Sequence, residues 1–291
     1  MTADSGALDT GAYAYTGMIT REPAEALAGL LGVEVSDGLS ATLPPLWHWV
    51  YLRARPPQSE LGLDGHPTRG VPAPPGPGLR RMYAGGRLTT YAPLRFDEPA
   101  KRTARVVATV DKHGTSGPLT FVTTRETIEQ AGEISIVDEF DAVYRPAESV
   151  LTRPGVPPAT ATPPKDEPSD DSFTFDVDPV VLFRFSALTY NAHRIHYDLD
   201  YAKSEGYPAL VVHGPLQTLL MADMLRRHGV SVVGREFAYR LVAPALGAQR
   251  LTVVTNLDQP ELPVQVRDAQ GRVTATSTTN TVPATATELQ R

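Results

Sequence analysis

Residues 211–229, VVHGPLQTLLMADMLRRHG, carry the strongest helix signal in the chain. Apolar residues recur every three or four positions from Leu216 to Leu225, which is the spacing of one face of a helix. Pro215 suits the first turn of this helix, and Gly229 suits the residue that follows its last turn. Because additional apolar residues widen the face, we expect other structure to wrap around the helix.

Runs of β-branched residues follow this helix and are separated by Pro, Gly and Asp turns, which indicates an antiparallel sheet. They span residues 234–246, 249–258, 262–268 and 271–282. A further β-rich run, DPVVLFRFSALTY at 178–190, precedes the helix and is predicted to be a strand. A short helix is expected at 199–205.

The first half of the chain repeats this layout. A helical run at 20–32 starts with Thr20 as its N-cap and closes at Gly32, and residues 43–54 predict a second helix. Strand-like runs follow at residues 86–96, 102–114, 117–128 and 132–144.

A short sequence echo links the halves, RLTTYAPL at 87–94 and RLVAPAL at 240–246. With the matching layout, it favours an α+β protein made of two copies of one unit, each a curved antiparallel sheet around a central helix. The stretch 145–172 is rich in Pro, Ala, Thr and acids and predicts a linker, while 66–78 predicts a long loop. We therefore expect an N-terminal domain, a linker and a C-terminal domain at residues 1–147, 148–172 and 173–291.

The composition limits the possible functions. The 291 residues are 41% hydrophobic and carry a net charge of −6 without a basic run, which argues against nucleic-acid binding. The chain has no cysteine, so disulfides and thiolate metal sites are excluded. No secretory signal and no apolar stretch of membrane-spanning length are visible, so the sequence predicts a cytoplasmic protein without a membrane partner.

The segment NAHRIHYDLDYA at 191–202 gathers proton-transfer groups more densely than any other part of the chain. His196 is a natural proton shuttle, because imidazole titrates near neutrality. His213 and Gly214 stand at the start of the predicted helix, where free N–H groups form a site for an oxyanion. Together they suit proton transfer beside a thioester carbonyl. Asp198 precedes the short helix and is predicted to cap it.

These residues resemble the hydratase motif D-x-N-P-[IL]-H-x-D-x-x-[FY]-A of MaoC-like hot-dog proteins, and VVHGPL at 211–216 resembles the HGM turn of that family. The wider stretch 183–217 resembles the subgroup of 3-hydroxyacyl-thioester dehydratases and mesaconyl- and itaconyl-CoA hydratases. Residues 44–49 and 112–124 resemble the N-terminal dehydratase-like domain of its two-domain members. The resemblance implies a double hot-dog fold whose first half is a degenerate copy that shapes the acyl pocket.

The resemblance also implies roles for single residues. His196 falls on the catalytic histidine, and Gly214 on the glycine whose N–H binds the thioester carbonyl. The catalytic Asp of the family corresponds to Asn191, which cannot take a proton but can orient a water; a simple turn residue is an equal alternative. His193 falls on a non-catalytic position and is expected to be structural or to contact substrate.

Further substrate contacts are expected at Tyr190, at Arg184 and at His213. Arg184 is assigned to the predicted strand, where a solvated arginine is the alternative to one that holds a substrate carboxylate. His213 has shaping the turn as its alternative role. His48 in LWHWV has no partner motif in the sequence.

The implied function is reversible hydration or dehydration of an enoyl- or 3-hydroxyacyl-thioester. A mesaconyl- or itaconyl-type acyl group would need a buried Arg or Lys, and a fatty acyl group an apolar tunnel. The alternatives are a polyketide-type tailoring dehydratase or cyclase and an inactive thioester-binding subunit. No metal or cofactor is expected beyond the CoA or carrier protein of the substrate, and the chain would act as a monomeric pseudo-dimer or a homodimer.

Overall fold

The computed structural model describes residues 7–8, 12–33, 42–72, 79–114, 117–146, 171–259 and 261–282. The strands are β1 (Ala7–Leu8), β2 (Ala12–Met18), β3 (Leu79–Thr90), β4 (Pro99–Gly114), β5 (Gly117–Gln130), β6 (Glu133–Pro146), β7 (Ser172–Val177), β8 (Arg235–Leu241), β9 (Gln249–Thr255), β10 (Val264–Arg267) and β11 (Val273–Thr281). The helices are α1 (Arg21–Leu31), α2 (Pro179–Thr189), α3 (Leu199–Ser204) and α4 (Gly214–Arg227), with 3-10 turns η1 (Trp47–Val50), η2 (Gln58–Glu60) and η4 (Arg194–His196).

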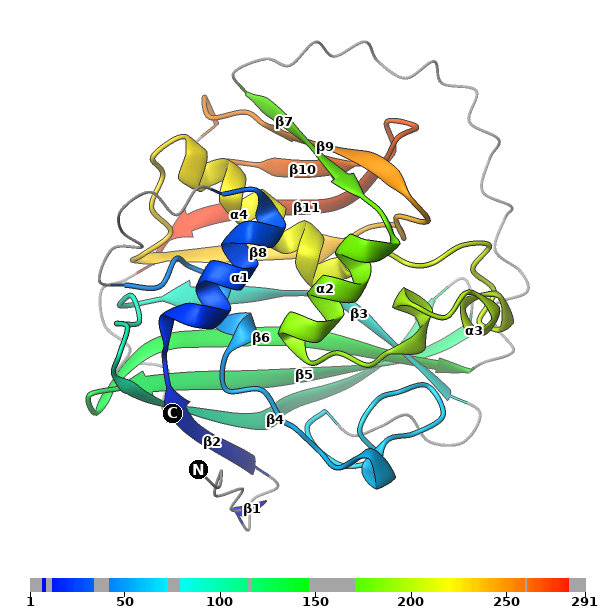
Figure 1. The fold of residues 1–291 in the computed structure, drawn as a ribbon, viewed down its shortest axis with the longest axis horizontal. Coiled ribbons are helices and arrows are strands. Elements are labelled where there is room, and N and C mark those ends of the chain that lie inside the picture. The colour runs from blue at the N-terminus through cyan, green and yellow to red at the C-terminus, as the bar shows by residue number, and fades with distance from the viewer. Residues whose placement is uncertain are drawn as a thin grey trace.

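All the described strands form one antiparallel sheet in the order β1-β2-β4-β5-β6-β3-β8-β11-β10-β9-β7. Apart from β1, the order on one side of the β3–β8 seam mirrors the order on the other. A helix also follows the outer strand of each half, α1 after β2 and α2 after β7 (Figure 1). The two echo segments begin on β3 and β8, which pair directly, with Gly85 opposite Arg240. The duplicated unit and the double hot-dog fold are thus confirmed, and one chain supplies both hot-dog units.

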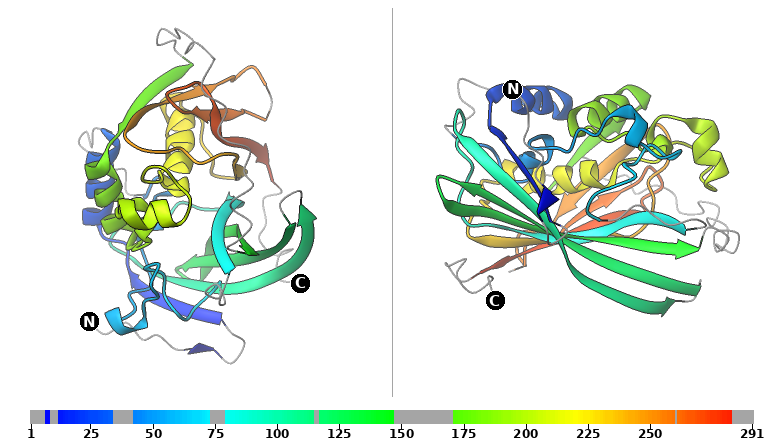
Figure 2. Two further views of the ribbon diagram at one scale, coloured as in Figure 1. Left: turned by 90° about the vertical axis from the view of Figure 1, so that its right-hand side faces the viewer. Right: turned by 90° about the horizontal axis from the view of Figure 1, so that it is seen from below.

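The second half has the central helix that its apolar pattern predicts. Helix α4 packs on β9, β10 and β11, and the sheet curves around it (Figure 2). Its most deeply buried side chains include Leu216, Leu219, Leu220 and Met221. The buried Gln217 amide accepts a hydrogen bond of 2.6 Å from the Thr274 hydroxyl on β11, which satisfies a polar group in this core.

The first half differs, because the predicted helix at 43–54 shrinks to the single turn η1, whose four residues are all buried. Pro44 and Pro45 come before it and lack backbone N–H groups, and Leu46 adopts a left-handed φ of 68°. Within the described residues this half therefore has no central helix, contrary to the expectation of two equivalent units.

The predicted strand at 178–190 is the helix α2, and this expectation was wrong. The Asp178 carboxylate accepts a hydrogen bond of 2.7 Å from the Val181 N–H, and Pro179 occupies the first turn. This N-terminal signal outweighs the β-branched composition of the segment. Helices α1 and α2 lie side by side as an outer layer (Figure 1).

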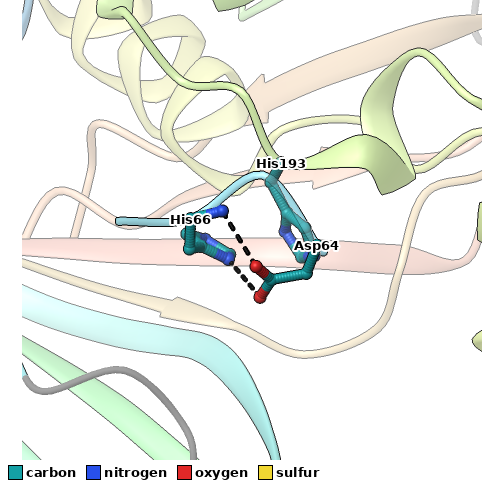
Figure 3. A group of neighbouring side chains, drawn as sticks. All are labelled: Asp64, His66 and His193. Atoms are coloured by element: carbon teal, nitrogen blue, oxygen red, sulfur yellow. Dashed lines mark hydrogen bonds and ion pairs between the residues drawn. The ribbon is translucent and has the colours of Figure 1, made fainter. Parts of the chain in front are cut away.

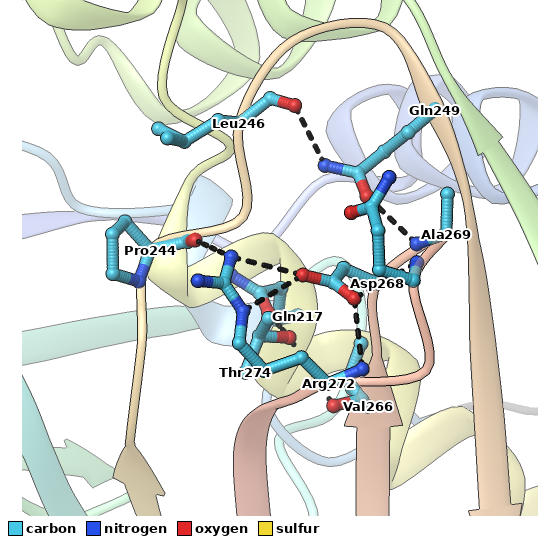
Figure 4. Close-up of polar contacts among 10 residues, drawn as sticks. Gln217, Pro244, Leu246, Gln249, Val266, Asp268, Ala269, Arg272 and Thr274 are labelled. Atoms are coloured by element: carbon cyan, nitrogen blue, oxygen red, sulfur yellow. Dashed lines mark hydrogen bonds and ion pairs between the residues drawn. The ribbon is translucent and has the colours of Figure 1, made fainter. Parts of the chain in front are cut away.

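The loop that joins β8 to β9 is held to the turn between β10 and β11 by polar contacts (Figure 4). Arg272 bonds to the Asp268 carboxylate and donates a hydrogen bond of 3.1 Å to the Pro244 carbonyl. The next residue, Ala245, accepts a hydrogen bond of 2.9 Å from the Val212 N–H. These contacts fix the backbone on which the helix start is built.

The predicted linker, 148–172, lies outside the described residues except for its last two positions, and Ser172 already belongs to β7. Residues 66–72 of the predicted loop 66–78 are described and form a loop. No helix in the described part of the chain is long and apolar enough to cross a membrane.

Candidate active site

Asn191 ends α2 and redirects the chain toward η4. Its side-chain oxygen accepts a hydrogen bond of 3.0 Å from the His193 N–H, and its own N–H donates to the Ser186 carbonyl. This is an Asx turn, in which the side chain imitates a backbone turn. The turn role of Asn191 is therefore present in the structure, and it uses one of the two lone pairs of the amide oxygen.

His196 lies in η4 with its proton position fixed. Nδ1 is 2.7 Å from the Val211 carbonyl oxygen, so Nδ1 carries the proton and Nε2 keeps a lone pair. The side chain is only 7% exposed. Burial lowers the pKa of His196 to about 4, against the opposing effect of the Val211 hydrogen bond. The imidazole is therefore neutral at physiological pH and able to accept a proton at Nε2.

His213 packs against one face of the His196 ring. The two rings stack with centroids 3.6 Å apart, and His213 Nε2 bonds to the Ser186 hydroxyl at 2.9 Å. His213 is 0% exposed, so it has no surface to offer a substrate. The expected substrate contact of His213 is thus corrected: this residue holds the His196 ring in place.

Gly214 is the first residue of α4, and its N–H forms no hydrogen bond with any described residue. N–H groups at this position have no partner within a helix and point toward possible anionic ligands. A Cβ at position 214 would overlap the Leu241 side chain, so glycine also lets α4 approach β8. Because the preceding residue, His213, stacks on His196, this free N–H begins the helix beside the His196 ring, as an oxyanion site requires.

Two expected substrate contacts lie away from the histidines. Arg184 is on the helix α2, not on a strand, and is exposed on the side that faces Gly29 of α1. Tyr190 caps α2 and is 56% exposed. Asp198 caps α3 as predicted, because it accepts a hydrogen bond from the Tyr201 N–H at 3.0 Å.

No motif in the sequence indicated that the first half contributes to this cluster. The loop after η2 brings Asp64 and His66 against His193 (Figure 3). The ring centroids of His66 and His193 are 4.1 Å apart, and those of His193 and His196 are 5.6 Å apart. With His213 the result is a row of four imidazoles, drawn from both halves of the chain.

Electrostatics keep this row neutral. Burial, followed by the charges that His66 and His196 would carry, lowers the pKa of His193 to about 2. Burial also lowers the pKa of His66, although its bond to Asp64 opposes this. Burial alone would raise the pKa of Asp64, but the hydrogen bonds from His66 outweigh it and hold that pKa well below its usual range. An ionised carboxylate therefore ends a row of neutral imidazoles.

The cluster also bears on the expectation that there is no metal. The ligand atoms of Asp64, His66 and His193 all lie within 4.8 Å of one another, a spacing at which they could hold a metal ion. One carboxylate and two imidazoles are a donor set that suits zinc. The Arg81 guanidinium lies close enough to lower the pKa of both histidines, and this positive charge opposes a cation at the same place.

A second buried polar group lies in the first half, around Asp138. Its carboxylate accepts a hydrogen bond of 2.6 Å from the Trp49 indole and lies 3.3 Å from His48 Nε2. His48 thus has a partner that the sequence did not reveal. Arg53 is near enough to Asp138 and Tyr83 for their charges to affect its pKa, which burial and the Arg102 charge lower. Among the described residues, none forms a hydrogen bond or ion pair with Arg53.

Comparisons with known proteins agree with this architecture. Residues 46–247 match the family model described as hydroxyacyl-thioester dehydratase type 2. The chain is 44% identical to mesaconyl-C(4)-CoA hydratase of Chloroflexus aurantiacus, over 87% of this chain and 90% of that protein. It is 28% identical to the mitochondrial hydroxyacyl-thioester dehydratase type 2 of Schizosaccharomyces pombe, over 81% of this chain and 88% of that protein. A MaoC-like dehydratase from Phytophthora capsici shares the fold with a TM-score of 0.66 and 16% identity, over 95% of this chain and 98% of that one.

Proposed function

The chain belongs to the hydroxyacyl-thioester dehydratase type 2 family of hydro-lyases, and from that premise we propose that it adds water reversibly to an enoyl-CoA thioester. One observation carries the proposal. His196 presents a neutral imidazole with its Nε2 lone pair free, and the helix whose first N–H is unpartnered begins beside it at Gly214. A base and an oxyanion donor at one place are what hydration of such a double bond requires.

The proposed reaction moves one proton. His196 Nε2 takes a proton from water as the water oxygen bonds to the β-carbon. The electrons of the double bond move toward the thioester oxygen, where the Gly214 N–H stabilises the developing charge. The imidazolium then gives the proton to the α-carbon, which restores neutral His196. Dehydration is the reverse of these steps.

For the acyl group, we propose a short chain that ends in a second carboxylate. The relative at 44% identity is named for mesaconyl-C(4)-CoA. A carboxylate in the interior needs a cation, and Arg53 is a half-buried guanidinium without a bonded partner among the described residues. An arginine of this kind favours bidentate binding of a carboxylate. A fatty acyl chain would leave that charge without a partner.

A series of contacts leads from Gly214 to the neighbourhood of Arg53, which supports a substrate that reaches both groups. Gly214 packs on Leu241, and Tyr239 lies two residues earlier on the same face of β8, a separation of about 7 Å. The Tyr239 hydroxyl bonds to the Tyr83 hydroxyl, which lies near Arg53. Burial raises the pKa of both tyrosines well above the usual range, so the hydroxyls stay protonated.

The test is a panel of CoA thioesters incubated with the purified protein and followed by mass spectrometry for gain or loss of water. The panel holds mesaconyl-type dicarboxylic, straight-chain enoyl and 3-hydroxyacyl thioesters. We expect an 18-dalton change that is fastest with the dicarboxylic members. No change with any member would overturn the proposal and favour a carrier-protein tailoring role or an inactive binding subunit.

A further inference from the structure

The reacting water needs a second polar contact besides His196, and the amide oxygen of Asn191 has only one lone pair left to offer. The other lone pair accepts the His193 N–H in the Asx turn. A water held by one acceptor alone can rotate away from the attack direction, which lowers the rate. The site therefore calls for another acceptor near His196, and this reasoning rests on the function proposed above.

The loop of the first half that reaches the cluster is docked firmly on the second half. The Arg194 N–H donates to the Asp64 carbonyl at 2.9 Å, and the Arg194 guanidinium donates to the Leu63 carbonyl at 3.0 Å. Gly65 has a φ of +86°, and a Cβ there would overlap the Ala192 carbonyl oxygen. The loop thus approaches the catalytic segment so closely that only glycine fits.

Asp64 holds the His66 ring in one orientation and one protonation state. One carboxylate oxygen accepts the His66 backbone N–H at 2.9 Å, and the other lies 2.9 Å from Nδ1 (Figure 3). An ionised carboxylate only accepts hydrogen bonds, so Nδ1 must carry the proton. His66 Nε2 then keeps its lone pair, as His196 Nε2 does. Asp64 also makes this imidazole a better acceptor, because it stabilises partial positive charge on the ring.

His66 differs in this respect from the histidine between it and His196. The His193 ring has no hydrogen bond to any described residue, so nothing among them fixes its orientation or its proton. His66 has a carboxylate partner, and it lies close enough to His196 that a positive charge on its ring would lower the pKa of His196. Of His66 and His193, His66 is therefore the residue whose ring is fixed in a way that lets it assist His196.

We propose that His66, held by Asp64, is a catalytic residue that binds the reacting water in place of the carboxylate absent at position 191. The water donates one hydrogen to His196 Nε2 and the other to His66 Nε2. As its oxygen bonds to the β-carbon, the first proton moves to His196 and later to the α-carbon. The second proton remains on the oxygen and becomes that of the product hydroxyl. Asp64 is a positioning residue that keeps Nε2 of His66 unprotonated.

The test uses the full-length protein with His66→Ala and Asp64→Asn, and with His113→Ala as a matched control, because His113 is an exposed histidine on β4. We expect His66→Ala to lower kcat about 10²-fold, in the range for one proton-transfer contact, while KM changes less than about threefold. Asp64→Asn is expected to lower kcat about tenfold. Added imidazole should restore part of the His66→Ala rate, a response that a purely structural role would not show.

The outcomes separate this inference from the proposed function. If the wild type hydrates the thioesters and His66→Ala keeps at least a third of its kcat, the inference is overturned and the function stands. If the wild type is inactive on the whole panel, the function itself fails. If EDTA abolishes wild-type activity and Zn²⁺ restores it, Asp64, His66 and His193 bind a metal, and the water-binding role of His66 is overturned. A His66→Ala protein that unfolds is replaced by Asp64→Asn, for which the same kcat and imidazole readouts apply.

Discussion

The two halves of the chain share one topology but differ at the centre. The second half wraps its sheet around the fourteen-residue helix α4, whose N-terminus lies beside His196. Among its described residues, the first half has only the four-residue turn η1 at the corresponding place. The two copies of the repeated fold thus offer different groups to one site. The second half offers the unpartnered Gly214 N–H at the start of its helix, and the first half offers Asp64, His66 and Arg53.

The largest effect is expected from His196, the proposed base of the second half. His196→Ala should lower kcat by about 10²–10⁴-fold on the best dicarboxylic thioester, because the variant lacks the group that we propose takes the proton from water. Initial rates from the loss of enoyl-thioester absorbance provide the measurement. The exposed His113→Ala should keep wild-type rates, and a similar loss in both variants would point to damaged folding rather than lost chemistry.

A smaller effect is expected from the Arg53 guanidinium of the first half. Arg53→Met should raise KM for a dicarboxylic thioester about 10²-fold, since the second carboxylate loses its partner. The KM for a straight-chain enoyl thioester should change little. Arg55 is exposed and two residues away, so Arg55→Met is the control. Equal KM changes for both classes of thioester would mean that Arg53 does not bind the second carboxylate.

The docking of the halves can be tested at one backbone position. Gly65→Ala should lower kcat about tenfold and the free energy of unfolding by about 1–3 kcal/mol, because its Cβ would overlap the Ala192 carbonyl. Gly132 has a φ of +84° but no atom near a Cβ, so Gly132→Ala carries the strain without the overlap. Thermal melts and rates of both variants make the comparison. An equal kcat in the two variants would show that loop docking does not matter to catalysis.

The smallest effect is a pH dependence of stability. The pKa of His196 is about 4 and that of His193 about 2, both below the value near 6.5 of an unfolded chain. Between pH 6.5 and 4 these two imidazoles bind protons in the unfolded state but not in the folded state. The free energy of unfolding therefore falls as the pH is lowered. The melting temperature should drop by several degrees over this window. His193→Gln should flatten the slope; an unchanged slope would contradict the burial of a neutral His193.

Much of the fold was predictable because its signals are local. The apolar spacing of α4, its Pro at the start and Gly229 at its end are all contained in the helix itself. Asp198 was predictable as a cap for the same reason. The helix α2 was misread because its β-branched and aromatic residues favour strands, while the deciding signal was the pair Asp178 and Pro179.

The candidate site was only half predictable. His196 and Gly214 lie in one recognisable segment, but His66 lies in a Pro- and Gly-rich loop more than a hundred residues earlier. Its partner Asp64 is two residues away, a spacing that also occurs in ordinary turns. Only the docking of the loop on Ala192 brings them to the cluster, and that contact depends on the packing of the two halves. The glycine at 65 is the single local hint.

A double-mutant cycle of His66 and His196 shows whether both halves of the chain act on one water molecule. The measurement is kcat for His66→Ala, His196→Ala and the double variant on the best thioester of the panel. Groups that serve the same water are not additive, so we predict that His66→Ala costs about 10²-fold in the wild type but less than about threefold in the His196→Ala background. If His66→Ala lowers kcat by the same factor in both backgrounds, the two histidines do not act on the same water molecule.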